Sequence, residues 1–190
     1  MKQLTICITG SIAAYKIPSL IDQLNRYPIT IYVAMTTNSQ SFVSPLTLEV
    51  LSKNKVVTNM VESQVHASVD HIFLAQESDL IIIMPATANI IGKISNGIAD
   101  DIVSTICMAS PNKIPKLICP AMNTEMYNQP ILQDNLLKLE ARNYKELPPK
   151  VDMLTSGTIG IGALAESNII LSEILENLGF CNEKEMLLNV

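Results

Sequence analysis

The sequence predicts one α/β domain in which helices cover both faces of a parallel β-sheet. Its 190 residues fit a single domain, for which roughly 100–200 residues is usual. Segments with strand character alternate with segments of helical spacing, and this order is typical of right-handed βαβ units. The strand segments are continuous apolar runs, as expected where both faces of a sheet are covered. The core is therefore expected on two sides of one sheet.

The first half of the chain supplies three strands and two helices. An apolar run, LTICIT, is followed by Gly10-Ser11 and then by apolar residues at helical spacing. The stretch 53–69 is polar and irregular, and Pro85 is expected to end the third strand. The expected elements are strands at 4–9, 29–35 and 79–84 and helices at 12–25 and 45–52.

The second half continues the alternation. Residues 148–165 carry Pro and Gly without periodicity and are expected to be irregular. Residues 181–190 are expected to be a frayed tail that follows a single domain at 1–180. The expected elements are helices at 88–97, 100–109, 130–142 and 167–178 and strands at 116–119 and 144–147.

The composition argues against several classes of protein. The net charge is −5 and Lys and Arg do not cluster, so nucleic acid is not expected as a partner. The longest apolar run, at 80–86, is far shorter than the roughly 20 residues that span a bilayer. The cysteines lack zinc spacing and no third ligand type accompanies His66 and His71, so no metal site is expected.

The low content of charged residues indicates that the chain associates with copies of itself. Only 16% of the residues are charged, against about 25% in typical domains, which predicts that part of the surface is buried against copies of the same chain. No export signal is recognisable at the N-terminus. Three of the cysteines lie in apolar runs, as core thiols do, and a reducing cytoplasm is the expected location.

Polar or small residues follow four of the expected strands. In an open parallel sheet, ligands bind beyond the carboxyl ends of the strands, so these four loops are expected to meet at one crevice. Their composition suggests a small planar or phosphorylated ligand. The loops are Thr9-Gly10-Ser11, Thr36 to Ser39, Pro85 to Asn89 and Pro120 to Asn123.

Each motif in these loops also has a purely structural interpretation. Gly10 could let a phosphate approach the backbone, or Ser11 could simply cap a helix. Thr87 fits a helix cap, which leaves Asn89 without a role. A buried amide without partners costs roughly 1–3 kcal/mol, so Asn123 is either paired to backbone or held for a ligand.

For two further stretches, the residues alone leave more than one interpretation open. A lone histidine such as His71 is usually solvated or satisfied within the core. Residues 156–166, SGTIGIGALAE, have little side-chain bulk, which suits a mobile flap or a plain surface loop.

Taken together, these stretches resemble the homo-oligomeric flavin-containing cysteine decarboxylases. The resemblance covers roughly residues 3–175 and, in PAMN and GIGALAE, is greater to the branch of coenzyme A biosynthesis than to the lantibiotic branch. It implies a flavodoxin-like or Rossmann-like three-layer fold, FMN as cofactor, and a homotrimer or homododecamer with FMN between subunits. The segments that carry it are TGSIAAYK at 9–16, His71, PATANIIGKISNGIADD at 85–101 and PAMNTEMY at 120–127.

The resemblance also implies a reaction: FMN-dependent decarboxylation of 4′-phosphopantothenoylcysteine to 4′-phosphopantetheine, the work of a carboxy-lyase. A cysteine carboxylate has no adjoining electron sink, and oxidation of the Cβ–S unit to a thioaldehyde creates one. FMN accepts the hydride, and loss of CO₂ leaves an enethiolate. Two alternatives are a decarboxylase of another, possibly peptidyl, cysteinyl substrate that releases the enethiol, and a non-catalytic FMN-binding regulatory subunit.

Site residues follow from the resemblance by position. His71 is implied to be the active-site base, Asn123 to bind the substrate carboxylate, and Met126 to line the same pocket. Residues implied to contact FMN are Gly10, Ser11, Ile12, Thr36, Ser39, Phe42, Thr87, Ala88, Asn89 and Ala121.

One position departs from the family pattern. The coenzyme A branch carries a Cys-Gly pair in the flap, and that cysteine protonates the intermediate. Here the pair is Ser156-Gly157, followed by Thr158 in place of an acidic residue. A serine hydroxyl is a far weaker acid than a thiol of pKa about 8.5, so Ser156 bears on whether the enethiol is reduced.

Overall fold

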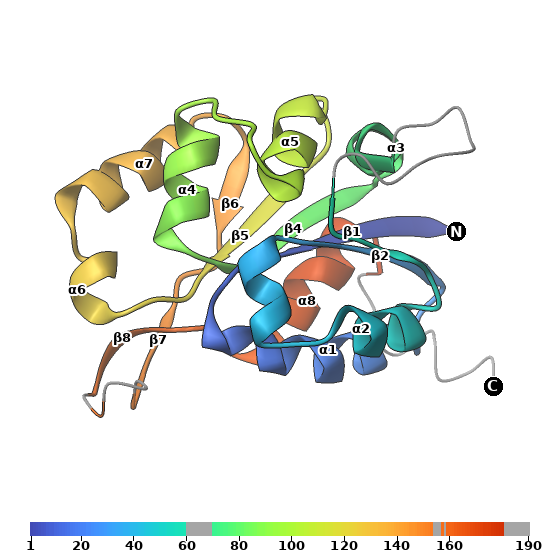
Figure 1. The fold of residues 1–190 in the computed structure, drawn as a ribbon, viewed down its shortest axis with the longest axis horizontal. Coiled ribbons are helices and arrows are strands. Elements are labelled where there is room, and N and C mark those ends of the chain that lie inside the picture. The colour runs from blue at the N-terminus through green and yellow to red at the C-terminus, as the bar shows by residue number, and fades with distance from the viewer. Residues whose placement is uncertain (60–69, 154–156, 158, 181–190) are drawn as a thin grey trace.

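A computed structural model describes residues 1–59, 70–153, 157 and 159–180 (Figure 1). Its main sheet has six parallel strands in the order β3-β2-β1-β4-β5-β6. This is the order of doubly wound dinucleotide-binding folds, and without the short β3 it becomes the flavodoxin order. The predicted fold class is confirmed. The strands are β1 (Lys2–Ile8), β2 (Ile29–Met35), β3 (Val56–Val57), β4 (Leu80–Ala86), β5 (Lys116–Pro120) and β6 (Tyr144–Glu146).

Helices cover both faces of this sheet. On one face lie α1 (Ile17–Leu24), α2 (Pro45–Ser52) and α8 (Ser167–Asn177) (Figure 1). The other face carries α3 (Asp70–Glu77), α4 (Ala88–Ser95), α5 (Ile102–Ala109) and α7 (Pro130–Glu140). The remaining elements are the 3₁₀ helices η1 (Ile12–Lys16) and η2 (Thr37–Ser41), the one-turn helix α6 (Thr124–Tyr127), and an antiparallel hairpin of β7 (Lys150–Met153) and β8 (Ile159–Ala163).

The core is divided by the sheet, as the apolar runs predict. In β1, Leu4, Ile6 and Ile8 pack in one hydrophobic cluster with α1 and α8, whereas Cys7 belongs to the cluster on the opposite face. Successive side chains of a strand point to opposite faces, so a strand buried on both sides must be apolar throughout. At roughly 25 cal/mol per Å² of buried apolar surface, these two layers supply the main stabilisation of the fold.

Several boundaries differ from the prediction for local reasons. The expected helix at 12–25 is divided into η1 and α1, because Pro18 has no backbone N–H to continue the first helix. Pro85 lies within β4 rather than ending it. The register between β4 and β5 shifts between Ile83 and Ala86, so no ladder hydrogen bond is required from Pro85.

The elements that were not predicted are α3, β3, η2, α6 and the two strands of the β7–β8 hairpin. The two-residue β3 and the one-turn α6 are too short to produce a periodic pattern. The hairpin contains Gly160 and Gly162, which weaken strand character. The expected tail at 181–190 lies outside the described residues.

No helix in the described part of the chain combines the length and the apolar character that crossing a bilayer requires.

Candidate functional site

Two adjoining cavities lie at the carboxyl ends of β1, β4 and β5. The hairpin cavity has a volume of about 400 Å³ and extends toward β7 and β8. The α4 cavity, of about 510 Å³, extends toward η2 and the first turn of α4. Both are lined by Gly10, Thr87, Ala88 and Met126, so they form one continuous cleft. Since β1 and β4 are the neighbours at which the strand order reverses, this is where a ligand is expected.

Gly10 sets the wall between β1 and the loop after β2. A Cβ atom at this position would lie 2.7 Å from Cβ of Asn38, closer than real side chains approach. Glycine therefore allows the two loops to meet and leaves the cleft open above them. The next residue, Ser11, caps η1, and its Oγ accepts from the N–H of Ala13 at 3.4 Å. The structural interpretation of Ser11 is correct, and the residue also lines the hairpin cavity.

The first turn of α4 points its backbone donors toward the cleft. Thr87 caps the helix by accepting from the N–H of Ile90 at 3.4 Å, and its own N–H donates to Oγ1 of Thr9 at 3.1 Å. The N–H groups of Ala88 and Asn89, in the first turn, have no intrahelical acceptor. Both residues line the α4 cavity, so Asn89 has a place there that helix capping does not explain.

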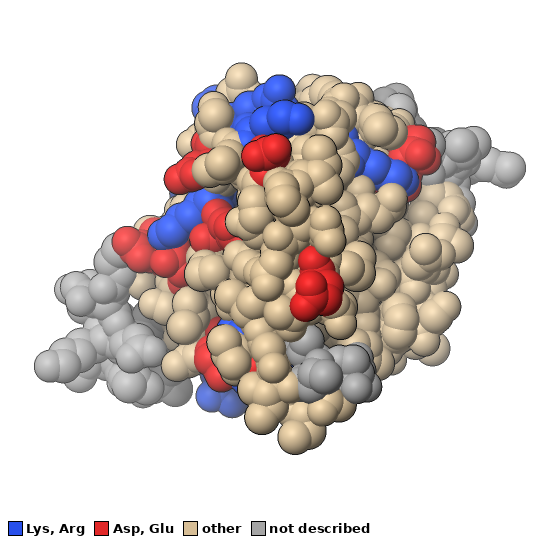
Figure 2. All heavy atoms as spheres, turned by 90° about the vertical axis from the view of Figure 1, so that its left-hand side faces the viewer, with Lys and Arg blue, Asp and Glu red and all other residues tan. Residues whose placement is uncertain are grey.

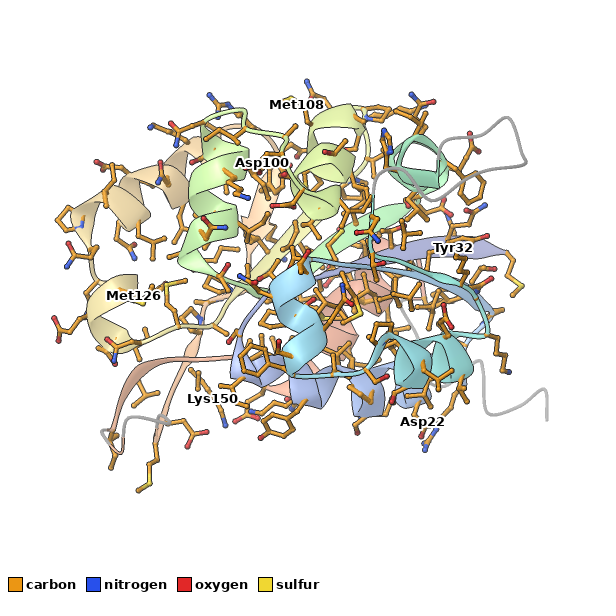
Figure 3. All side chains as sticks on the ribbon, viewed as in Figure 1. Asp22, Tyr32, Asp100, Met108, Met126 and Lys150 are labelled. Carbon is orange, nitrogen blue, oxygen red and sulfur yellow. The ribbon has the colours of Figure 1, made fainter. Side chains whose placement is uncertain are left out.

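Asn123 is paired to backbone, and its place at the cavity is also compatible with the ligand interpretation. Its Oδ1 accepts from the N–H of Glu125 at 2.8 Å and caps α6, so the amide is paired to backbone. Its Nδ2 donates to none of the residues that the structure describes, and the residue lines the hairpin cavity. The expectation of a buried amide is wrong, because α6 lies at the rim of the cleft and Asn123 is exposed. Met126, on the same turn, is also exposed (Figure 3).

The β7–β8 hairpin is anchored on the segment that precedes and begins α6. The N–H of Met122 donates to the carbonyl of Gly162 at 2.9 Å. A Cβ atom at Gly162, whose φ is +147°, would strike the carbonyl oxygen of Met122, and one at Gly160 would strike Oγ1 of Thr124. Two glycines thus let the hairpin backbone lie directly on this segment. In the stretch 156–166, residues 159–163 therefore form a strand that contacts this segment and are not a plain surface loop.

Charge in the cleft is sparse. In the hairpin cavity the charged lining residues are Lys16 and Asp152. Lys150 donates to Asp152 at 2.6 Å, and this hydrogen bond lowers the pKa of the carboxyl. In the α4 cavity, Lys93 contacts Asp101 at 2.7 Å, and hydrogen bonds to Asp100 and Asp101 raise the pKa of the lysine. Figure 2 shows this side of the molecule with most acidic and basic side chains next to one another in a few groups and neutral surface between them.

The cleft brings together most of the residues that the sequence singled out. Thr36 lines the α4 cavity, whereas neither Ser39 nor Phe42 is among the described residues that line either cavity. Ser39 is buried and donates its Oγ to the carbonyl of Thr36 at 2.7 Å, so it supports the loop. Ser156 lies outside the described residues. The hairpin cavity is lined by Gly10, Ser11, Ile12, Thr87, Ala88, Ala121, Asn123 and Met126, and Asn89 lines the α4 cavity.

His71 is not brought to the cleft of its own chain. It lies at the beginning of α3, which Figure 1 shows far from α6 and the hairpin. His71 is half-buried, and its Nδ1 is buried without a hydrogen bond to any described residue. The residues expected to share one active site, His71 and Asn123, are therefore separated within a single chain.

Among the lining residues of the hairpin cavity that sequence reasoning missed are Tyr15, Lys16, Asp152 and Met153. The first two belong to the quoted TGSIAAYK segment, and the short 3₁₀ helix η1 places their side chains at the cavity. A helical projection of residues 12–16 could have found them. Asp152 and Met153 depend on the hairpin, which the sequence pattern does not predict.

The donor set of the cleft fits a planar ring that carries a phosphate. Apolar side chains of Ile12, Ala121 and Met122 offer flat contacts, and the free N–H groups of α4 suit an anion. No group of three His, Cys, Asp or Glu side chains within the described ranges is arranged to hold a metal ion.

Comparison with known proteins gives consistent matches. A family model described as Flavoprotein matches residues 1–179. A probable phosphopantothenoylcysteine decarboxylase of Streptococcus mutans is 41% identical over 177 residues, which are 93% of this chain and 99% of that protein. The chain spans 47%, about half, of the bifunctional coenzyme A biosynthesis protein CoaBC of Borreliella burgdorferi.

Two solved structures share the fold. A cysteine-to-serine mutant of PPC decarboxylase, complexed with pantothenoylaminoethenethiol, has a TM-score of 0.83 and 30% sequence identity, over 91% of this chain and 96% of that one. The FMN binding protein AtHal3 has a TM-score of 0.80 and 29% identity, over 91% and 94%.

Proposed function

This chain belongs to the Flavoprotein family, and on that premise we propose that it decarboxylates 4′-phosphopantothenoylcysteine to 4′-phosphopantetheine in coenzyme A biosynthesis, with FMN as cofactor. The observation that carries the proposal is the position of Asn123. Its free Nδ2 stands at a cavity that adjoins a cleft suited to a phosphorylated planar ring. A carboxylate and a flavin are therefore accommodated side by side.

Each part of the cleft has a role in this reaction. The N–H groups at the start of α4 hold the phosphate of FMN, whose ring supplies the hydride acceptor when it is bound. Nδ2 of Asn123 donates to the substrate carboxylate and fixes its orientation. Met122, Met126 and the hairpin form an apolar wall that excludes water, which favours loss of charge from the carboxylate as CO₂.

Lys16 supplies a positive charge for the substrate. Among the described residues it forms no ion pair, and its Nζ lies 5.9 Å from the ring centroid of Tyr15. A substrate with both a carboxylate and a phosphate gains from such a cation in a cleft with little other charge.

The base, His71, must come from another copy of the chain. It lies away from the cleft of its own chain, so an assembly that places α3 of one subunit at the hairpin cavity of the next would complete the site. A homotrimer, or trimers gathered into a homododecamer, is the assembly that the family resemblance implies.

A second candidate differs in substrate and product. Ser156 stands where the resembling enzymes of coenzyme A biosynthesis have a thiol, which favours a decarboxylase that releases the enethiol. Single turnover distinguishes the two, because a sulfur-conjugated enethiol absorbs in the near ultraviolet and the saturated thiol does not. If this second candidate is right, single turnover gives oxidised enethiol with reduced flavin, and Ser156→Cys shifts the product toward the saturated thiol. Saturated phosphopantetheine from the unmodified chain would instead require another proton donor.

The test of the whole proposal is direct. Purified protein should be yellow with about one FMN per chain and should release CO₂ from 4′-phosphopantothenoylcysteine. Gly10→Asp places a carboxylate at the proposed phosphate side and also strikes Asn38, so it should give colourless protein. Protein that binds FMN but releases no CO₂ from any cysteinyl compound would support the regulatory alternative. Protein that stays colourless in FMN would refute both.

A further inference from the structure

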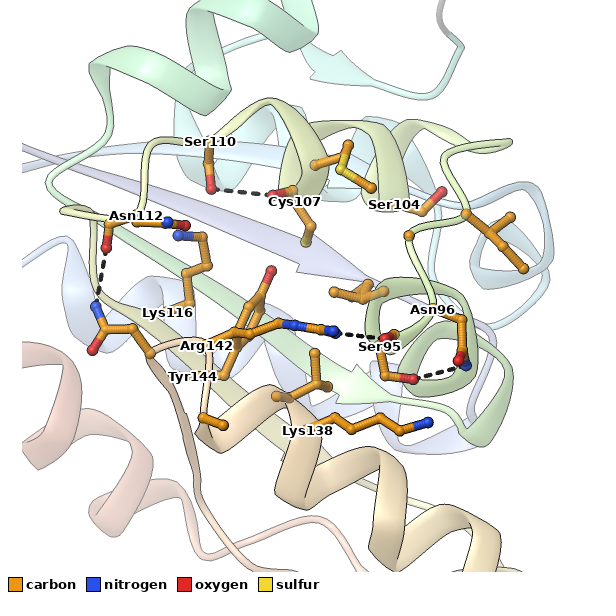
Figure 4. A pocket seen from close by; sticks show the side chains of 17 residues that line it. Ser95, Asn96, Ser104, Cys107, Ser110, Asn112, Lys116, Lys138, Arg142 and Tyr144 are labelled. Atoms are coloured by element: carbon orange, nitrogen blue, oxygen red, sulfur yellow. Dashed lines mark hydrogen bonds between the residues drawn. The ribbon is translucent and has the colours of Figure 1, made fainter.

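We call the cleft formed by the hairpin cavity and the α4 cavity the flavin cleft. A third cavity lies at the amino ends of β5 and β6, on the opposite side of the sheet's strands from this cleft. It has a volume of about 770 Å³ and is bounded by the C-terminal end of α4, by α5, by the end of α7 and by the first residues of β5 and β6 (Figure 4). We call it the opposite-edge cavity. Its volume is within the range of about 300–1,000 Å³ that small-molecule sites occupy.

The charged residues that line the opposite-edge cavity are all cations: Lys116, Lys138 and Arg142. No Asp or Glu is among the described lining residues, although the whole chain has a net charge of −5. None of the three cations forms an ion pair with a described residue. Positive charge is therefore gathered in a hollow and left without a counter-charge from the described part of the protein.

Lys116 is at the base of this cavity and is only 3% exposed. Its Nζ donates to the carbonyls of Pro111 and Ile114, each at 3.1 Å, and lies 5.5 Å from the ring centroid of Tyr144. An ammonium group has three donors, so one remains. Burial lowers the pKa of Lys116, because the charged form loses hydration without gaining an anion.

Arg142 and Lys138 stand at the exposed rim, and Figure 4 shows Arg142 extending across the cavity toward Ser95. The guanidinium donates one hydrogen bond, at 2.6 Å, to the carbonyl of Ser95. Four of its five N–H donors have no acceptor among the described residues, and the contact of Lys138 with a described residue is a long one of 3.5 Å to Oδ1 of Asn135.

A purely structural role accounts for part of this arrangement. Lys116 satisfies two backbone carbonyls in the loop between α5 and β5, and Arg142 satisfies the carbonyl of Ser95 at the end of α4, which is a common use of cations. That role explains neither Lys138 nor the lack of acidic side chains around a hollow of this size. Apolar side chains on the same walls, among them Ile98 and Met108, would suit the organic part of a ligand.

We propose that the opposite-edge cavity is a second binding site, separate from the flavin cleft, for a small phosphorylated organic molecule. Arg142 and Lys138 bind the phosphate oxygens at the rim, because guanidinium and ammonium groups are the usual phosphate donors. The remaining donor of Lys116 binds at the base. Occupancy supplies the counter-charge that the described residues do not place there.

The test uses FMN-loaded protein, freed of excess FMN so that the flavin cleft is filled. Pyrophosphate is titrated by calorimetry at constant ionic strength. We expect saturable binding with a Kd below about 1 mM. Arg142→Gln and Lys138→Gln should each weaken it by about 10-fold or more, the effect of losing a charge-assisted hydrogen bond.

Lys113→Gln is the matched control, because it makes the same change of charge on a neighbouring exposed lysine that does not line the cavity. It should leave the pyrophosphate Kd unchanged, and all three variants should keep their flavin absorbance. Equal weakening by Lys113→Gln would show that only general surface charge is involved. No saturable binding, or binding that survives both rim variants, would overturn the proposal. Lys138→Gln alone decides the matter if Arg142→Gln does not fold.

Discussion

Asn123 combines a structural contact with an exposed position at the cavity. Its Oδ1 accepts from the N–H of Glu125, whereas its Nδ2 donates to no residue that the structure describes, and the residue lines the hairpin cavity. The cap fixes the rotation of the amide, so the free donor is held in one direction without a further residue to orient it.

This division of roles predicts different results for two substitutions at Asn123. Aspartate caps helices as well as asparagine does, so Asn123→Asp should keep the fold and FMN but lose substrate binding through repulsion of the carboxylate. Asn123→Ala should lose substrate binding and also about 0.5–2 kcal/mol of stability with the cap. Denaturant unfolding and decarboxylation kinetics measure the two effects separately. An Asp variant with unchanged KM would remove Asn123 from the substrate site.

At the scale of elements, the hairpin depends on where its glycines fall. Gly160 and Gly162 allow contact with Thr124 and Met122, whereas Gly92, inside α4, has no atom within 4 Å of the position a Cβ would take. The same substitution should therefore have opposite consequences at these sites.

Gly160→Ala should displace the hairpin from α6, because its Cβ would strike Oγ1 of Thr124. We expect kcat/KM for decarboxylation to fall by 10-fold or more, as about 1–3 kcal/mol of overpacking is relieved by movement of the hairpin. Flavin absorbance should be retained. Gly92→Ala, the control, should raise the unfolding free energy by about 0.5–1 kcal/mol and leave activity unchanged. A Gly160→Ala enzyme with normal activity would show that the hairpin contact is dispensable.

The start of β1 gives a prediction that depends on pH. The carboxylate of Asp79 accepts from the N–H of Gln3 at 2.8 Å and from Nζ of Lys2 at 3.0 Å, and the backbone hydrogen bond is the main reason that its pKa is lowered. A lowered carboxyl pKa contributes stability above the unfolded value of about 3.9, and this is lost as pH falls through the folded pKa.

Asp79→Asn should therefore lower the unfolding free energy at pH 7, by no more than about 1 kcal/mol because the pair is partly solvated. The difference from the parent protein should shrink as pH falls below the unfolded value of about 3.9 and should disappear below the folded pKa, where both side chains are neutral. Denaturant unfolding at pH 7 and at a series of acid pH values measures it. A difference that persists at acid pH would mean that packing, not charge, accounts for the effect.

At the scale of the whole molecule, the surface argues for assembly. Leu46 and Val50 lie one turn apart on α2 and are 66% and 69% exposed. Exposed apolar side chains of this size, together with a low content of charge, are typical of surfaces that pair with another protein. An assembled state would also resolve the separation of His71 from the cleft.

Subunit mixing tests whether one active site draws on two chains. His71→Asn and Asn123→Asp should each be inactive alone. Co-expressed in equal amounts, they should recover about a quarter of the parent activity, because random pairing unites an intact His71 with an intact Asn123 at one interface in four. Light scattering of the mixture confirms that assemblies form. A mixed sample without activity would place both residues in one chain and overturn the shared site.

The sequence by itself determined five of the six strands of the main sheet, because their signal is local. The bounds of β2 and α2 are predicted to the residue, since Ile29–Met35 and Pro45–Ser52 each carry an apolar pattern with clear ends. The loops at the carboxyl ends of β1, β4 and β5 could be assigned to one crevice because ligands of open parallel sheets bind beyond these ends. The sequence also marked Asn123 and left its two interpretations open.

Tertiary structure decided what depends on contacts between distant segments. The hairpin forms because Gly160 and Gly162 can touch the backbone and side chains near α6, and a glycine in the sequence does not show what approaches it. The exposure of Asn123 and the position of Lys16 follow from how α6 and η1 meet across the cleft. His71 and Asn123 lie apart within one chain because α3 and α6 are at distant places in the fold, and the order of motifs along a sequence does not show this distance.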